Sequence, residues 1–154
     1  MADLHDLSLS DVCRRTKSGE LSAVRVTEHM LARIAAKDPA LRSFVTVTGE
    51  QARATAARLD ADRVAGRPLG ALHGVPIALK DLLSTAGVRT TCGTRVLRDW
   101  IPDEDAHVVT RLVQAGAVVL GKVKLTEGAF SNHHPEVEAP RNPWNAAHWT
   151  GVSS

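Results

Sequence analysis

Residues 72–82 of the chain read LHGVPIALKDL, and this stretch decides the fold expected for the rest. Its apolar part, from Gly74 to Leu79, is short and contains both glycine and proline, which is typical of a buried β-strand. The strand ends on Lys80 and Asp81. Burial disfavours the charged form of an ammonium group, so a lysine here can serve as a neutral base near pH 7. The alternative is a structural lysine whose stem packs while its ammonium reaches water, held by Asp81.

The composition is that of a globular protein of about one domain. Of the 154 residues, 44% are hydrophobic and only 3% are aromatic, so alanine and aliphatic side chains must form most of the core. The formal net charge is +2, with both signs interspersed. No basic stripe interleaved with aromatic residues is present, so nucleic-acid binding has no support. No apolar run approaches the roughly eighteen residues of a membrane span.

The cysteines and the N-terminus indicate the compartment. Cys13 and Cys92 are the only cysteines, and their separation fits neither a disulfide framework nor a zinc site. The polar, acidic start MADLHDLSLSD is unlike a signal peptide. We therefore expect a soluble, cytoplasmic protein.

Two helices are predicted near the N-terminus. Ser8 or Ser10 can cap a short helix that closes at Gly19. Ser22 can cap a longer helix, which we expect Pro39 to stop.

A short strand and a third helix follow. Residues 44–47 are predicted to be a strand, and residues 50–65 an alanine-rich surface helix that closes at Gly66.

A loop and another helix are predicted beyond the lysine strand. Residues 84–94, STAGVRTTCGT, form a loop of the kind on which sites are usually built. Pro102, Asp103 and Glu104 predict the first turn of a helix that ends at Gly116.

The last part of the chain changes character. Residues 117–120 are predicted to be a second buried strand, and residues 125–130 a helical turn or two, so strand and helix alternate as in an α/β fold. Residues 131–154 have no amphipathic period but carry Trp144 and Trp149. We expect this segment to be an ordered loop packed onto something, since two tryptophans are costly to leave in disorder.

Residues 131–154 also contain candidate metal ligands. His133 and His134 lie near Glu136 and Glu138, but adjacent histidines tend to point apart and no HExxH spacing is present. The chain also lacks GxGxxG after a strand and GxxxxGK[ST]. We expect no metal site and no nucleotide site of these types.

Three segments in one chain resemble the amidase signature family in order and spacing: GVPIALKD, QAGAVVLGKVKLTE and NPWNAAHWTGVSS. The resemblance runs from about Leu69 to the last residue. It implies an α/β fold, namely the N-terminal part of the amidase signature fold, a mixed β-sheet covered by helices on both faces. Residues 1–68 would be an N-terminal helical region with one short strand. Residues 69–154 would begin the core, from the catalytic lysine strand to the paired-serine loop, and the chain would be truncated after it.

The resemblance also implies a Ser-Ser-Lys triad that works without metal or cofactor. Lys80 matches the catalytic lysine, and Ser153 matches the middle serine, which in the family sits on a cis peptide bond. Ser154 and Gly151 are assigned supporting roles. The segment that matches a substrate-lining part of similar proteins contains Ala129, Phe130 and Ser131.

Two departures from the family pattern are visible. Val152 replaces the second of two glycines that usually precede the paired serines, which narrows the backbone options there. The nucleophilic serine of the family lies a couple of dozen residues beyond the paired serines, and therefore beyond Ser154.

The function implied is hydrolysis of the C–N bond of a small amide, with esters or carbamates as further substrates, through an acyl-enzyme. One alternative is the glutaminase subunit of a tRNA-dependent amidotransferase. Val152 and the absence of a basic tRNA-facing patch favour a free-standing amidase over that glutaminase. The other alternative is a non-catalytic truncated fragment or interaction module. The oligomeric state, including a homo-oligomer, is left open.

Overall fold

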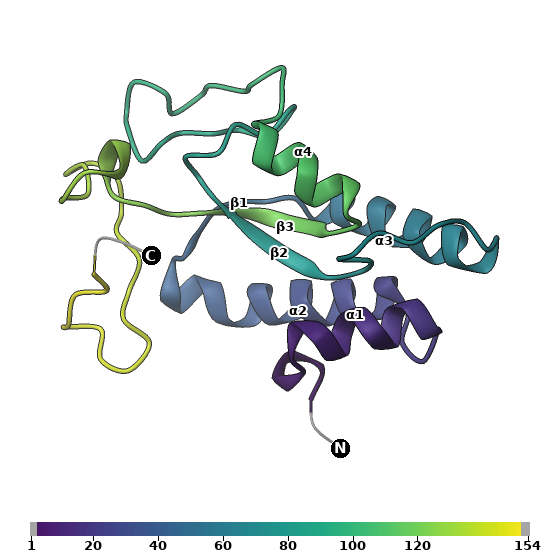
Figure 1. Cartoon of the computed structure of the whole chain (residues 1–154). Coiled ribbons are helices and arrows are strands. Elements are labelled where there is room, and N and C mark those ends of the chain that lie inside the picture. The colour runs from purple at the N-terminus through teal and green to yellow at the C-terminus, as the bar shows by residue number, and fades with distance from the viewer. Residues whose placement is uncertain (1–2, 152–154) are drawn as a thin grey trace. The chain divides into compact units, whose positions relative to one another are not determined.

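The computed structural model describes residues 3–151 and is a mixed α/β structure (Figure 1). Helices and strands alternate along the chain, which confirms the predicted fold class. The elements in chain order are η1 (Leu4–Asp6), α1 (Leu9–Ser18), α2 (Ala23–Leu41), β1 (Phe44–Val47), α3 (Gly49–Val64), β2 (Pro76–Lys80), α4 (His107–Gln114), β3 (Val118–Val123) and η2 (Glu127–Ala129).

The strands form one mixed sheet in the order β1-β3-β2. Strand β1 pairs antiparallel with β3. Strands β2 and β3 run parallel, because Val118 N–H donates to the Val75 carbonyl and, further along both strands, Asp81 N–H donates to the Val123 carbonyl. The helix between β2 and β3 makes the crossover that parallel strands require.

The strand expected to be buried is buried only in part. Leu79 is 3% exposed, but Ala78 in the middle of β2 is exposed. Within residues 3–151, β2 is an edge strand of the sheet, so fewer side chains surround it than its apolar sequence predicts.

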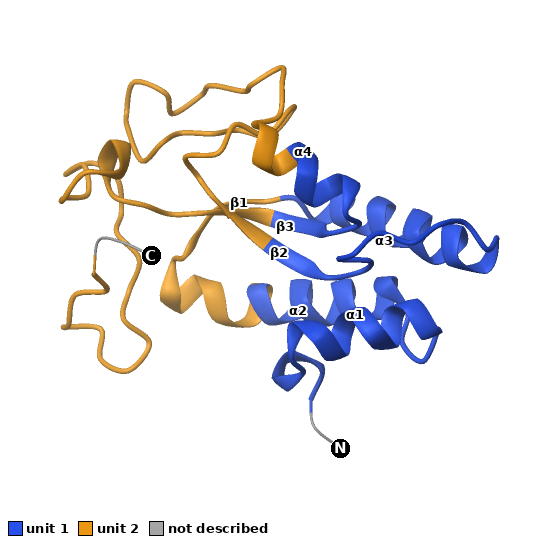
Figure 2. Cartoon of the chain, viewed as in Figure 1, with its two compact units in different colours: residues 1–34, 48–77, 110–120 blue, residues 35–47, 78–109, 121–154 orange. Residues whose placement is uncertain are grey.

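The chain divides into two compact units (Figure 2). Unit 1 comprises residues 1–34, 48–77 and 110–120, and unit 2 comprises residues 35–47, 78–109 and 121–154. Helices α2 and α4 and strands β2 and β3 contribute residues to both. We describe each unit by itself.

Unit 1 contains most of the helical core. Within it, α1 and α2 lie on one side of the blue parts of β2 and β3, and the blue part of α4 lies on the other (Figure 2). Two apolar clusters fill this unit. One joins α1 and α2 to the start of β2 through Val12, Cys13, Leu21, Val26 and Val75. The other joins α2 and α3 to β3 through Ala23, Leu31, Ala52, Ala56, Leu59, Val118 and Leu120.

The first predicted helix forms with the predicted caps. The Ser8 hydroxyl accepts from Asp11 N–H at 3.1 Å at the start of α1. Gly19 closes the helix with φ of 81°, a left-handed conformation that glycine adopts without steric cost.

Helix α2 does not stop at Pro39 as predicted but continues to Leu41. Pro39 lies in the last turn, so only one late N–H donor is lost there. The helix ends where Arg42 adopts φ of 55°. Beyond that residue, the Asp38 carboxylate accepts from Ser43 N–H at 2.6 Å and directs the chain into β1.

Helix α4 begins at His107 rather than at Pro102. Contacts with the preceding loop explain the difference. The Pro102 carbonyl accepts from Gly87 N–H at 2.9 Å, and the Asp105 carboxylate accepts from Ala86 N–H at 2.7 Å. The acidic segment is therefore used to fix residues 84–94 instead of forming the first helical turn.

The start of α2 is capped from a distant helix, and the loss of this cap should be measurable. The Asp60 carboxylate of α3 accepts from Ala23 N–H at 2.8 Å and from Val24 N–H at 3.1 Å. Asp60→Ala should lower the free energy of unfolding by about 1–2 kcal/mol, because two helix N-terminal donors lose their acceptor. Chemical denaturation of the full-length protein measures this. Glu28→Ala, which removes only the exposed ion pair with Arg53, should change stability by less than about 0.5 kcal/mol, and equal losses in both variants would contradict the prediction.

The C-terminal part of unit 2, from residue 131 to residue 151, contains no helix or strand. The segment was expected to pack onto something, but the described part of the chain does not cover its tryptophans, since Trp144 is 94% exposed and Trp149 is 64% exposed. None of the helices described is both long and apolar enough to span a bilayer.

Candidate functional site

Lys80 is placed as the sequence predicted, at the last position of β2, where it is half buried. The next residue, Asp81, is fully buried and continues the strand pairing through its N–H bond to the Val123 carbonyl at 2.9 Å. Both residues belong to unit 2. The local sequence explains the geometry, because the apolar run before Lys80 forms a strand and the backbone turns away directly after Asp81.

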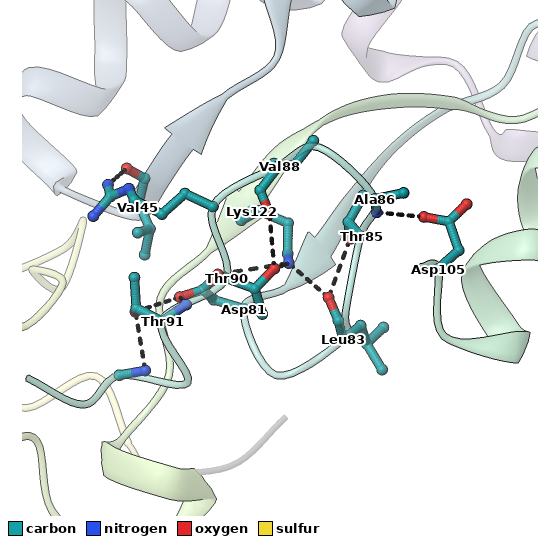
Figure 3. Close-up of polar contacts among 12 residues, drawn as sticks. Val45, Asp81, Leu83, Thr85, Ala86, Val88, Thr90, Thr91, Asp105 and Lys122 are labelled. Atoms are coloured by element: carbon teal, nitrogen blue, oxygen red, sulfur yellow. Dashed lines mark hydrogen bonds and ion pairs between the residues drawn. The ribbon is translucent and has the colours of Figure 1, made fainter. Parts of the chain in front are cut away.

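A second lysine, which the sequence analysis did not single out, is the most buried large side chain of this region. Lys122 lies on β3 and is 0% exposed. Its Nζ donates to the Leu83 carbonyl at 2.6 Å and to the Thr90 hydroxyl at 2.6 Å, and lies 3.6 Å from the Asp81 carboxylate (Figure 3). Burial lowers the pKa of Lys122, and the negative charge of Asp81 opposes that shift. Asp81 and Lys122 therefore form a buried ion pair between β3 and the end of β2.

The Asp81 carboxylate also fixes the loop of residues 84–94. Its Oδ2 accepts from Thr91 N–H at 2.9 Å and from the Thr91 hydroxyl at 2.5 Å. Arg89 holds the same loop to β1 by donating to the Val45 carbonyl at 3.0 Å. The loop predicted to carry functional residues is thus anchored to the residue that follows Lys80.

Two backbone hydrogen bonds connect Asp81 to η2. Cys92 N–H donates to the Asp81 carbonyl at 3.0 Å, and Gly128 N–H donates to the Cys92 carbonyl at 2.8 Å. Cys92 has φ of 52° and Ala129 has φ of 65°, a left-handed conformation that costs a non-glycine residue roughly 1–2 kcal/mol. Such strain persists only where surrounding contacts enforce it.

The three residues predicted to line the substrate, Ala129, Phe130 and Ser131, lie at and just beyond η2. Phe130 is 79% exposed, so within the described chain it is not the ordinary core residue that its apolar ring would suggest. The bonds through Cys92 link this segment to the strand end that carries Lys80. Their contact with a substrate stays a prediction.

The paired-serine segment is described only at its start. Gly151 is exposed and has φ of 88°, and among the described residues other than its chain neighbours, no atom lies within 4 Å of where its Cβ would be. Ser153, its predicted cis peptide bond, Ser154 and Val152 lie outside the described residues. Their roles therefore stay predictions from the sequence.

The histidine and acidic side chains of residues 133–138 do not form a ligand cluster. Glu136 pairs with Arg95 at 2.8 Å, and Glu138 pairs with Arg42. In residues 3–151, the one group of acidic and histidine side chains close enough to share a metal is Asp3, His5 and Asp6. Both aspartates there are exposed, as acidic surface groups commonly are without a metal.

A cavity of about 270 Å³ lies elsewhere in unit 2. Its lining includes Phe44, Arg89, Arg98 and Lys124, and none of the predicted site residues. Arg89 donates to the carbonyls of Val45 and Arg98. The cavity wall therefore includes a structural cross-link between the loop and β1.

Comparison with known proteins shows similarity to amidases and to an amidotransferase component. The sequence profile of the family described as Amidase matches residues 25–154. The putative amidase AmiD of Mycobacterium tuberculosis is 45% identical over 148 residues, which cover 96% of this chain and 31% of the relative. A second relative is a component of the glutamyl-tRNA(Gln) amidotransferase of Azotobacter vinelandii. It is 47% identical over 156 residues, which cover 98% of this chain and 32% of that component.

Solved structures agree with the sequence comparison. The peptide amidase of Stenotrophomonas maltophilia superposes with a TM-score of 0.85 at 36% identity, covering 95% of this chain and 32% of that enzyme. The chain thus spans about a third of the length of the relatives it matches.

Proposed function

This chain belongs to the amidase signature family, and from that membership we propose that it supplies the lysine strand and the paired-serine loop of an amidase about three times its length. The observation that carries the proposal is the match over residues 25–154, which includes Lys80 at the end of β2 and the segment up to Ser154. Residues beyond Ser154 would supply the nucleophilic serine and the oxyanion hole.

The proposed mechanism moves one proton along a relay. Neutral Lys80 accepts a proton from the Ser153 hydroxyl, and Ser153 accepts one from the nucleophilic serine as that serine attacks the amide carbon. The C–N bond then breaks, the amine leaves with a proton returned through Ser153, and an acyl-enzyme ester remains. Water hydrolyses that ester and restores both serines. Backbone N–H groups would hold the oxyanion.

We propose a small-molecule amide as the substrate, without metal or cofactor, and a cytoplasmic location. The predicted division into residues 1–68 and residues 69–154 also stays a proposal about the complete protein. Esters and carbamates share the acyl carbon that the nucleophile attacks and are included as further substrates.

A second candidate function follows from the similarity to the amidotransferase component. In that case the same triad would release ammonia from glutamine and pass it to a partner protein. Ammonia release from glutamine that rises when a partner protein is co-purified would favour this function. Turnover of a panel of simple amides by the isolated full-length protein, with glutamine inert, would favour the free-standing amidase.

Ser153→Ala in the full-length protein tests the relay. We expect amide hydrolysis to fall by about 10³-fold or more, because the nucleophile loses its path for proton transfer to Lys80. Steady-state kinetics measures the loss, and intact mass after brief reaction with an activated ester detects the acyl-enzyme. Hydrolysis at the wild-type rate in Ser153→Ala would contradict the relay.

A further inference from the structure

The residue next to the proposed base is unusually constrained. Asp81 is 0% exposed. Its N–H, carbonyl and Oδ2 are all hydrogen bonded, to Val123, Cys92 and Thr91 respectively. Its Oδ1 has no hydrogen bond within the described chain and faces Lys122 Nζ at 3.6 Å. A buried carboxylate with an oxygen that lacks a hydrogen bond is costly unless a charge compensates it, so Lys122 is the compensating group.

The groups around the Lys122 ammonium favour its charged form and so oppose the lowering of its pKa by burial. The Lys122 ammonium group donates to the Leu83 carbonyl and to the Thr90 hydroxyl, and the Asp81 carboxylate lies 3.6 Å from Nζ, where it acts through its charge. Each acceptor stabilises the charged form. This distinguishes Lys122 from a catalytic base, which must be neutral to accept a proton.

The pair stands at the start of a chain of contacts that ends at η2. From Asp81 the backbone bonds lead through Cys92 to Gly128. Cys92 has a strained conformation on this path, and so does Ala129, the residue directly after its end. Backbone strain of this kind concentrates at functional sites. The path joins the strand end that carries Lys80 to the segment predicted to line the substrate.

We propose that Lys122 and Asp81 are a positioning pair for the amidase reaction: Lys122 neutralises Asp81 beside Lys80, and Asp81 holds η2 in register with the strand end. The inference rests on the proposed function of Lys80 as a base. An unpaired carboxylate on the adjacent residue would favour the protonated form of Lys80 and so reduce the neutral fraction available at a given pH. Besides Asp81, the Cys92 thiol and the Asp105 carboxylate also act electrostatically on Lys122, and both favour its charged form.

The pH dependence of kcat/KM in the full-length protein tests the charge part. Lys122→Met leaves Asp81 unpaired, and we expect the acidic limb of the profile to move up by about one pH unit. Asp81→Asn leaves the positive charge of Lys122 in place. The acidic limb of this variant should therefore move to lower pH, or at least lie at lower pH than the limb of Lys122→Met. The double variant Asp81→Asn with Lys122→Met removes both charges and should return the limb to the wild-type position.

Lys124→Met is the matched control. Lys124 directly follows β3, its Nζ donates to the Glu138 carbonyl at 2.8 Å, and it makes no contact with the pair among the bonds of residues 3–151. The acidic limb of the kcat/KM profile of Lys124→Met should coincide with that of the wild type. Identical limbs in Lys122→Met, Asp81→Asn and wild type would overturn the proposal. If Lys122→Met does not fold, the comparison of Asp81→Asn with the double variant decides, because the two differ only in the charge of residue 122.

Amide hydrogen exchange tests the positioning part independently of catalysis. Loss of either member of the pair should raise exchange at Gly128 N–H by about tenfold or more, since its path to Asp81 loosens. Lys124→Met should leave it unchanged. If the wild-type protein hydrolyses no amide, the proposed function fails, yet exchange at Gly128 still decides the positioning role. Unchanged exchange at Gly128 in both single variants would overturn that role whatever the activity.

Discussion

Lys80→Ala is expected to reduce kcat/KM for amide hydrolysis by about 10⁴-fold or more in the full-length protein, because the proton relay loses its final acceptor. The fold should survive, since Lys80 is half buried at a strand end and its removal leaves no core cavity. Far-UV circular dichroism and the midpoint of chemical denaturation check the fold, and steady-state kinetics checks the activity.

Two further variants show whether the loss is chemical. Lys80→Arg keeps a long cation but not a neutral base, because a guanidinium stays protonated at any relevant pH, so activity should remain lost. Lys37→Ala, at an exposed position of α2, should be fully active. Turnover in Lys80→Ala close to that of wild type would refute the assignment of Lys80 as the base.

Gly121→Ala is expected to destabilise the protein by at least about 3 kcal/mol or to prevent folding. Gly121 lies on β3 opposite Val47 of β1. A Cβ there would overlap the Thr46 carbonyl and come within 3.0 Å of the Val47 Cα. Since both atoms belong to the backbone of the paired strand, relief requires the strands to separate.

Gly87→Ala is the matched control for that prediction. Gly121 has φ of 153° and Gly87 has φ of 69°, but at Gly87 no atom of the described chain, apart from neighbouring residues, lies within 4 Å of an added Cβ. Its replacement should cost only the conformational penalty of roughly 1–2 kcal/mol. Chemical denaturation of both variants separates steric overlap from backbone strain, and equal losses would show that contact with β1 is unimportant.

The parts of the fold that can be predicted from the sequence are those set by local chemistry. Three such features depend only on neighbouring residues, and each is found where it was predicted: the strand before Lys80, the helix cap at Ser8 and the helix end at Gly19. The end of α2 differs from the prediction because Pro39 is tolerated in the last helical turn, and the start of α4 differs because a more distant group decides it. Asp105 is engaged by Ala86 N–H, nineteen residues earlier in the chain.

The candidate site shows the same division. Lys80 can be located from its strand and from family resemblance, whereas Lys122 does not stand out, although it too is a lysine within an apolar strand. Adjacency in sequence suggests Lys80 as the partner of Asp81. The structure shows an ion pair of Asp81 with Lys122, forty-one positions away, and the parallel pairing of β2 with β3 brings these two side chains close.

The distribution of aromatic residues gives the two compact units different optical properties. The chain has no tyrosine and three tryptophans, Trp100, Trp144 and Trp149, and all three belong to unit 2. Intrinsic fluorescence excited at the indole band therefore reports on unit 2 alone. Most of the helical backbone belongs to unit 1, so circular dichroism reports chiefly on that unit. Two simple spectroscopic signals thus follow the two units separately without any added label.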